Sequence, residues 1–279
     1  MPSLSGHIPS ERFFPYLTWP QVEAMENKAN TLVIQPIGAI EQHGPHLPLI
    51  VDAAIATAVV GQTLQKLNPD IPAYALPTLH YGKSNEHWTF PGTLTLSAQT
   101  LTAVLMEMAE GIYRAGFRKL VLVNAHGGQP QVLEIVARDL RQRYGDLQVF
   151  PLFVWGAPHQ AAEIVGAHEY ETGIHAGDVE TSVMLALLPT QVDMDKAVRE
   201  FPVPFADGSL LSLEGRLPMA WTMDDLSESG VVGDATAATA AKGKAILASV
   251  SDGWVRVLEE IYAFPGLAPE GKSDAGSKI

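Results

Sequence analysis

The sequence of 279 residues has no cysteine, little positive charge and no long apolar run. Without cysteine the chain can form no disulfide and offers no thiolate to a metal, so any metal site must use histidine, aspartate and glutamate. Lys and Arg number 18 against 31 Asp and Glu, which gives a net charge of −13. Such a chain repels phosphate, and we therefore expect no nucleic-acid partner.

Sequence features that would bring the chain to a membrane are also missing. No window of about 18 apolar residues exists to span a bilayer, and no basic amphipathic stretch exists to bind its surface. The first 20 residues lack the charged and then apolar pattern of a signal peptide. We therefore expect a cytoplasmic protein without membrane contact.

Apolar residues, in contrast, are abundant at 47% of the chain, which is enough for a large core. Short apolar runs typical of buried strands alternate with segments of helical spacing. Strands are predicted over 31–38, 72–78, 119–124 and 147–154, and helices over 52–67, 97–116, 130–145, 180–188 and 238–262. This alternation predicts the α/β class, as a three-layer α/β/α sandwich around a mainly parallel sheet.

We expect one domain over residues 1–279, with a core of about 12–263, because no repeat, low-complexity tract or linker divides the chain. The N-terminal arm and the C-terminal tail from Pro265 are expected to be loosely ordered. Residues 189–233 are rich in proline and glycine and have weak periodicity. They predict a long loop that covers a functional site.

Side chains that bind metals gather at the ends of the predicted strands and at the starts of the helices. Ligands of open parallel sheets bind beyond the carboxyl ends of the strands, so these side chains are expected to meet at one rim. Imidazole and carboxylate groups together suit Zn²⁺, Mn²⁺ or Fe²⁺. The expected metal ligands are Glu41, His43, Asp52, His126 and Glu180.

Local spacing supports this set of ligands. Glu41 and His43 are two residues apart, so their side chains point the same way in an extended segment. Asp52 begins a helix, where a carboxylate is favoured and can bridge two ions. The three carboxylates carry −3 and two divalent ions carry +4, so one hydroxide makes the cluster neutral. We therefore expect two divalent metal ions.

The sequence leaves the roles of some nearby polar residues open. His46 either orients a ligand or fills its turn. His80 and His87 either line a pocket or have a structural role. Asp178 is expected to be a solvated residue at the start of a helix.

Taken together, the motifs resemble the creatininase (creatinine amidohydrolase) family. The resemblance rests on the segment from Pro36 to Asp52, on Asn124-Ala125-His126-Gly127-Gly128, and on His175-Ala176-Gly177 leading to Glu180-Thr181-Ser182. It implies a two-metal centre bridged by Asp52, hydrolysis of non-peptide amides, and a homo-oligomer, often a hexamer. The expected catalytic residues are His175, as an acid/base group that binds no metal, and the ligand Glu180.

One departure from the family concerns the substrate. Creatininase has a Glu ligand two residues after the histidine of the turn, where this chain has Gly128, and Glu180 is expected to replace it. The aromatic residue that creatininase uses upstream of His175 has no evident counterpart, because Tyr170 and Glu171 stand there. A small, possibly cyclic amide, a formamide and the end of a short peptide therefore all stay open as substrates.

Two hypotheses of other classes stand beside the hydrolase. A dinuclear phosphoesterase needs countercharge for phosphate, and no Arg or Lys lies within the three motifs. A non-catalytic, oligomeric metal-binding scaffold would make His175 dispensable. The motifs favour the amidohydrolase, in which two metal ions activate water and His175 protonates the leaving nitrogen of a small-molecule amide.

Overall fold

The computed structural model describes residues 4–206, 208–215 and 217–267. Most of the expected C-terminal tail therefore lies outside the described residues. In the described part of the N-terminal arm, Leu4 is exposed, whereas Ser5 and Ile8 are buried. Arg12 helps to hold the arm, because its Nη1 donates a hydrogen bond to Ile71 O at 2.5 Å.

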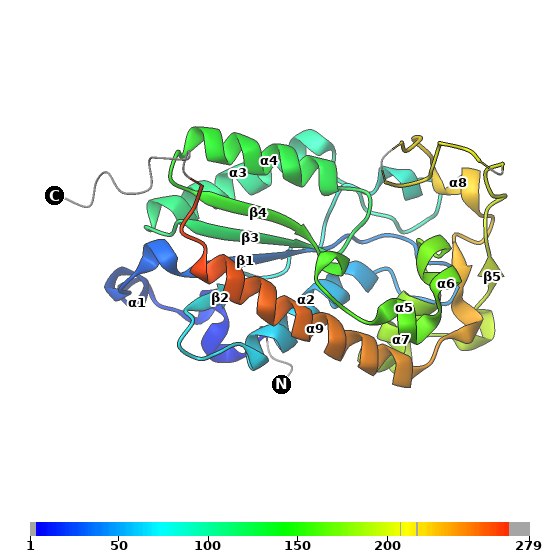
Figure 1. Ribbon diagram of the computed structural model, residues 1–279, viewed down its shortest axis with the longest axis horizontal. Coiled ribbons are helices and arrows are strands. Elements are labelled where there is room, and N and C mark those ends of the chain that lie inside the picture. The colour runs from blue at the N-terminus through cyan, green and yellow to red at the C-terminus, as the bar shows by residue number, and fades with distance from the viewer. Residues whose placement is uncertain (1–3, 207, 216, 268–279) are drawn as a thin grey trace.

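A parallel sheet lies at the centre of the described chain (Figure 1). Its strands follow the order β2-β1-β3-β4, and each neighbouring pair is parallel. The strands are β1 (Leu32–Ile37), β2 (Ala73–Ala75), β3 (Lys119–Asn124) and β4 (Gln148–Phe153). Every residue of β1 and β3 is buried, as their largely apolar sequences predict. Strand β2 is shorter than predicted because Pro77, which has no N–H, follows it and cannot extend the ladder.

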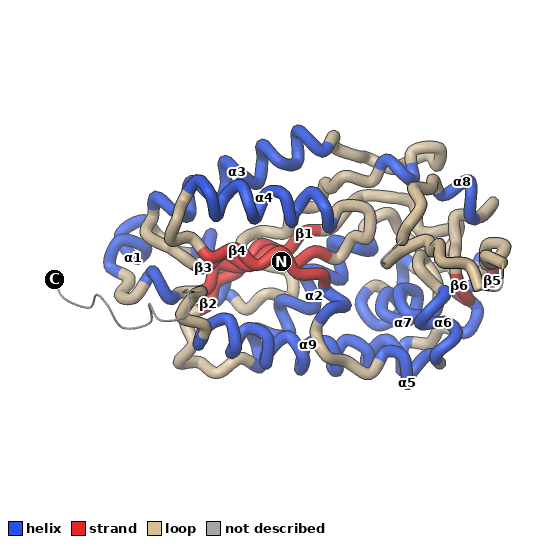
Figure 2. The backbone as a smooth tube through the Cα atoms, turned by 45° about the horizontal axis from the view of Figure 1, so that its top comes forward, coloured by secondary structure: helices blue, strands red, loops and turns tan. Residues whose placement is uncertain are grey.

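Helices cover both faces of the sheet (Figures 1 and 2). Helices α3 (Ala98–Arg114) and α4 (Pro130–Arg143) lie on one face. The other face carries α2 (Val51–Lys66), α7 (Asp178–Leu187) and α9 (Ala240–Ala263). The predicted three-layer α/β/α arrangement is therefore confirmed.

Each face of the sheet has its own apolar core, because successive side chains of a strand point to opposite sides. Val33 of β1 packs with Leu101 of α3 and Leu133 of α4. Ile34 of β1 packs with the residues of α2 and α9. These two cores fix the sheet between its helices and leave the ends of the strands free for polar residues.

Several short elements were not predicted, because none is long enough to display a helical or strand period. The short helices are α1 (Trp19–Ala24), α5 (Ala161–Val165), α6 (Ala167–Thr172) and α8 (Met223–Leu226). Strands β5 (Arg199–Glu200) and β6 (Gly233–Asp234) pair antiparallel. This pairing joins the first part of the predicted cover, 189–233, to its end. Among the described residues, no helix combines the length and the apolar character that a membrane crossing requires.

The order of the strands marks one end of the sheet as a binding position. From β1 the chain runs through α2 to β2, whereas from β3 it runs through α4, on the opposite face, to β4. The last residues of β1 and β3, Ile37 and Asn124, are paired neighbours. Ligands of such folds bind beyond the carboxyl ends of the strands at the point where the winding reverses.

Candidate metal centre

All five predicted ligands meet beyond the ends of β1 and β3. His126 Nδ1 lies 3.1 Å from Glu41 Oε2 and 3.4 Å from Asp52 Oδ2. His43 Nε2 lies 3.4 Å from Asp52 Oδ1 and 3.8 Å from Glu180 Oε2. These five residues are called the donor cluster below. The two oxygens of Asp52 therefore face two different histidines.

The separations in the donor cluster suit atoms that share a metal ion. Two ligand atoms that are each about 2.1 Å from one ion at a tetrahedral angle lie roughly 3.4 Å apart. Within the described part of the chain, His43 Nε2 and Asp52 Oδ2 are buried without a hydrogen-bond partner. Such unpaired atoms are costly to bury. Cations on the two sides of Asp52 would satisfy both atoms, so the cluster is able to hold metal.

Gly38 sets the position of the predicted ligands Glu41 and His43 relative to the predicted ligand Asp52. A Cβ at Gly38 would lie 2.4 Å from the backbone nitrogen of Ala53, so a larger residue does not fit. This approach brings the end of β1 against the first turn of α2, which carries Asp52. Glu41 N donates a hydrogen bond to Leu49 O at 3.1 Å and closes the intervening turn.

The turn that carries His126 is held by two amide side chains. Asn124 Nδ2 donates to His126 O at 2.7 Å, and His126 N donates to Asn124 Oδ1 at 3.1 Å. Gln129 Nε2 donates to Asn124 Oδ1 at 2.9 Å and to Gly38 O at 3.2 Å. The turn after β3 is thereby tied to the end of β1.

The segment before α7 turns sharply at Ala176. This residue is fully buried and has a φ of 54°, in the left-handed region that costs a non-glycine residue about 1 kcal/mol. Ala176 N donates a hydrogen bond to Glu180 Oε2 at 2.6 Å. The turn brings His175, whose Nδ1 lies 3.9 Å from Glu41 Oε1, and Glu180 to the same cluster.

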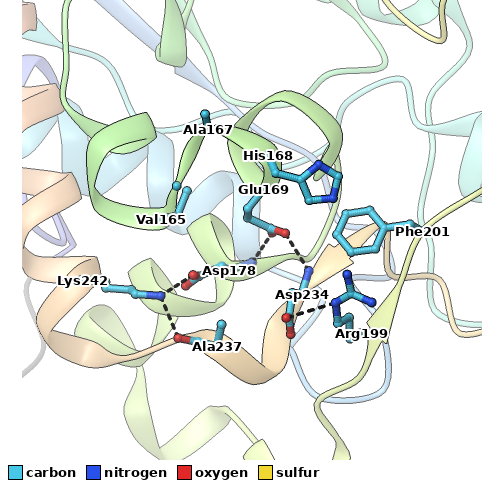
Figure 3. Close-up of a pocket in the computed structure, with 11 residues that line it drawn as sticks. Val165, Ala167, His168, Glu169, Asp178, Arg199, Phe201, Asp234, Ala237 and Lys242 are labelled. Atoms are coloured by element: carbon cyan, nitrogen blue, oxygen red, sulfur yellow. Dashed lines mark hydrogen bonds and ion pairs between the residues drawn. The ribbon is translucent and has the colours of Figure 1, made fainter. Parts of the chain in front are cut away.

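A cavity of about 330 Å³ lies behind the start of α7 and is lined by residues outside the donor cluster (Figure 3). Glu169 points into it and accepts hydrogen bonds from the backbone nitrogens of Asp178, at 2.8 Å, and Asp234, at 3.0 Å. The prediction of a solvated Asp178 is wrong, because its buried carboxylate pairs with Lys242 of α9 and accepts from Ser182 Oγ. These polar groups fix the start of α7.

Three residues near the cluster were missed or left open, and all lie on one short segment. Ser84 Oγ donates to Glu41 Oε2. Glu86 Oε1 lies 3.0 Å from His126 Nε2, and His87 Nε2 lies 3.7 Å from Glu41 Oε1. The polar run from 84 to 87 was the signal that could have found them. His80, in contrast, is exposed and bonds to Thr78 O.

Glu86 fills the space that a side chain at position 128 would need. A Cβ at Gly128 would lie 1.6 Å from Glu86 Oε1 and 2.5 Å from His126 Nε2. The same Nε2 donates to Lys83 O at 2.9 Å. Oxygen atoms behind a ligating histidine fix its tautomer and ring orientation. His126 therefore presents Nδ1 to the donor cluster.

His46 fills its turn and does not join the donor cluster. Its Nε2 hydrogen-bonds to Thr181 Oγ1 of α7 at 2.8 Å, and its side chain is buried. Burial and the nearby His43 lower the pKa of His46 to about 4. The neutral ring therefore joins the turn after β1 to the helix that carries Glu180.

Burial and charge strongly perturb the titration of the donor cluster. Burial lowers the pKa of His43, but the carboxylates of Asp52 and Glu180 outweigh it and raise the pKa to about 9. Burial also lowers the pKa of His126, but Glu41 and Asp52 outweigh it and raise the pKa well above its ordinary value. Burial, with repulsion from Asp52, raises the pKa of Glu180 to about 7. Without metal, the cluster therefore holds protons in place of cations.

We expect the metal-free protein to lose stability as the pH rises from 6.5 to 9. His43 and His126 have folded-state pKa values above the unfolded value, so their contribution is complete below pH 6.5 and is lost as the pH passes the folded value of about 9 for His43. The melting temperature after chelator treatment should fall by about 5 °C or more across this interval.

The control for this measurement is a histidine outside the cluster. The variant His80→Gln should show the same fall, because His80 does not contact the donor cluster. A melting temperature that stays constant or rises between pH 6.5 and 9 would contradict the protonated state of the two cluster histidines.

Comparison with known proteins decides the family. A family model described as creatinine amidohydrolase matches residues 15–258. The chain belongs to the creatininase family. The resemblance carried by the three sequence motifs is thereby confirmed.

Relatives of the chain in this family are named as hydrolases and peptidases. The mycofactocin precursor peptide peptidase of Mycolicibacterium smegmatis is 34% identical over 224 residues, which cover 80% of this chain and 82% of that protein. The creatinine amidohydrolase of Pseudomonas putida is 30% identical over 267 residues, covering 90% and 97%. The 3-dehydro-scyllo-inosose hydrolase of Thermotoga maritima is 27% identical over 269 residues, covering 91% and 84%.

Solved creatininase structures share the fold of this chain, and the descriptions of two of them name a metal. A mutant creatininase described as of Zn-Zn type superimposes with a TM-score of 0.71 at 28% identity and covers 90% of this chain and 98% of its own. A structure described as creatininase Mn gives a TM-score of 0.70 at 28% identity, covering 91% and 99%. The buried histidine and carboxylate groups of this chain are likewise able to bind metal.

Proposed function

We propose that this chain is a metal-dependent amidohydrolase that cleaves a C–N amide bond of a small molecule. The observation that carries the proposal is the position of Asp52, whose two oxygens face His126 and His43 inside a buried cluster. The reaction class is supported because the chain belongs to a family described as creatinine amidohydrolase.

In this proposal two divalent ions would be held by the donor cluster, one by Asp52, Glu41 and His126 and the other by Asp52, His43 and Glu180. Imidazole and carboxylate donors suit Zn²⁺ and Mn²⁺, the metals named for creatininase, as well as Fe²⁺. When bound, such ions polarise a substrate carbonyl and lower the pKa of water.

His175 is proposed to move the proton. Its Nε2 donates a hydrogen bond to Gln42 O at 2.8 Å, so its Nδ1 carries the lone pair that faces Glu41 Oε1. Burial and the neighbouring His43 hold the pKa of His175 well below its ordinary value, and the ring is therefore neutral. It takes a proton from the attacking water and gives it to the leaving nitrogen, because an amine leaves poorly as an anion.

The segment 189–233 is proposed to cover the site and exclude water. Trp221 and Leu213 of this segment pack against the buried side chains of α8. Trp221 Nε1 donates a hydrogen bond to Leu213 O at 3.1 Å, which closes the segment on itself. Exclusion of water from the site strengthens every electrostatic interaction within it.

A second candidate reaction is the removal of residues from the end of a short peptide. The relative named mycofactocin precursor peptide peptidase is 34% identical to this chain, against 30% for the creatinine amidohydrolase. Hydrolysis of a formamide rests on the family resemblance alone. All three reactions break a C–N bond beside a carbonyl group and would use the same cluster.

Hydrolysis of a panel of amides tests the proposal. Protein loaded with Zn²⁺ or Mn²⁺ should open the ring of creatinine to give creatine, or release an amine from formanilide or from blocked short peptides. Activity should vanish with a chelator and return with the metal. A protein that binds metal and cleaves none of these amides would instead favour the non-catalytic scaffold, and cleavage of p-nitrophenyl phosphate alone would favour the phosphoesterase.

The proposal also includes a homo-oligomer, with a hexamer favoured by the family resemblance, and a cytoplasmic location. The expected partner is a small-molecule amide. The mass of the protein in solution, measured by light scattering, tests the oligomer.

A further inference from the structure

Three imidazole rings lie next to one another at the edge of the donor cluster, each tilted by 31–33° from its neighbour. The ring centroids of His43 and His175 are 4.3 Å apart, and those of His175 and His87 are also 4.3 Å apart. The proposed function uses the first two rings but gives no role to His87. That ring is buried, and its Nε2 lies 3.7 Å from Glu41 Oε1, close to the 3.9 Å of His175 Nδ1.

Gln42 determines which nitrogen of His87 and of His175 carries a proton. Its backbone oxygen accepts from His175 Nε2 at 2.8 Å, and its two amide hydrogens serve Gly230 O and His87 Nδ1, which leaves none for His175 Nε2 at 3.2 Å. The orientation of the amide is fixed. Gly44 N donates a hydrogen bond to Gln42 Oε1 at 2.8 Å, and Gln42 Nε2 donates to Gly230 O at 3.1 Å. A flipped amide would set one N–H against another and one oxygen against another. The amide nitrogen of Gln42 therefore lies on the side of Gly230 and of the histidines.

This amide makes His87 a donor toward the cluster. Gln42 Nε2 lies 2.8 Å from His87 Nδ1. An amide nitrogen only donates, so His87 Nδ1 accepts and the ring proton lies on Nε2. His175 has its proton on Nε2 as well, bound to Gln42 O, but presents Nδ1 to Glu41. The neighbouring rings of His87 and His175 thus present opposite groups beside Glu41 Oε1: His87 presents an N–H and His175 presents a lone pair.

The same argument separates His87 from the metal ligands. Glu41, His87 and His175 are close enough together to hold an ion. A nitrogen that carries a proton, however, has no lone pair for a cation.

We propose that His87 donates its Nε2–H to the carbonyl oxygen of the scissile amide, and that Gln42 is the residue that positions it for this role. The inference rests on the proposed function. As water attacks the carbonyl carbon, the π electron pair moves onto the oxygen and the hydrogen bond from His87 strengthens. When the C–N bond breaks, the pair returns to form the product carbonyl, and no proton leaves His87. A buried donor aimed at such an oxygen stabilises the transition state.

Two variants of His87 test the proposal as a matched pair. The amide nitrogen of His87→Gln can reach the position of Nε2, whereas that of His87→Asn reaches only the position of Nδ1. On an amide that the wild type cleaves, His87→Asn should lower kcat by about 100-fold and change KM by less than about threefold. His87→Gln should keep at least about tenfold more activity than His87→Asn. Elemental analysis should find the same metal content in all three proteins.

Nitrogen-15 NMR of the metal-free protein at neutral pH reads the tautomer without any substrate. It should find the proton of His87 on Nε2 in the wild type and on Nδ1 in Gln42→Glu, where a carboxylate accepts in place of the amide. Equal activity of the two His87 variants, loss of metal in step with activity, or a wild-type proton on Nδ1 would each overturn the proposal. Failure of the proposed function looks different, since the wild type would then cleave no amide at all.

Discussion

Replacing Asp52 by asparagine should remove bound metal and amide hydrolysis together. The carboxylate of Asp52 faces His43 through one oxygen and His126 through the other, at 3.4 Å in each case. An asparagine has one oxygen and no charge, so at most one of the two sides keeps its ligand. We expect kcat/KM to fall by more than about 10³-fold and bound metal to fall by at least half.

Elemental analysis of protein purified without chelator, together with the amide assay, measures both effects. The matched control is Asp70→Asn, because Asp70 is exposed and outside the cluster. It should keep metal and activity. An Asp52→Asn protein that retains its full metal content but loses activity would show that Asp52 does not bridge two ions.

A glutamine in place of His175 should keep the metal and lower kcat by about 10²- to 10⁴-fold. Its amide nitrogen can still donate to Gln42 O, as His175 Nε2 does at 2.8 Å. What it lacks is a lone pair at the position of Nδ1, which faces Glu41. The variant therefore removes the proton carrier with little change in shape.

Steady-state kinetics and elemental analysis on the same preparations separate the possible roles of His175. His159→Gln is the control, since His159 bonds to Trp155 O and Tyr170 Oη and does not contact the donor cluster. Full activity of His175→Gln would refute the acid/base role. Loss of metal would make His175 a ligand.

The fold could be predicted because its long elements carry local signals that the structure keeps. Ser97 caps α3 by accepting a hydrogen bond from Thr100 N, and Pro130 opens α4. The buried strands β1 and β3 are largely apolar runs. The four short helices could not be predicted, since they depend on tertiary packing and contain too few residues to form an apolar stripe.

The position of the site was predictable from the sheet alone, but its surroundings were not. Asp52 and His126 come directly after strand ends or at a helix start, where parallel folds collect their ligands. Glu86 and His87 lie on a long segment without periodic structure, and nothing local brings them to the cluster. The partner of Asp178 is Lys242, 64 residues further along the chain. The sequence around Asp178 therefore could not predict that its carboxylate is buried.

Position 128 and position 86 compete for one volume, and this has a consequence for how the family diverges. A side chain at 128 would need the place that the Glu86 carboxylate occupies, since its first carbon would fall 1.6 Å from Glu86 Oε1. A larger side chain at either position therefore requires a smaller or displaced side chain at the other. Homologues should therefore alternate between two pairings, an acid at 86 with glycine at 128 or a shorter residue at 86 with a longer one at 128, and the two sites should covary.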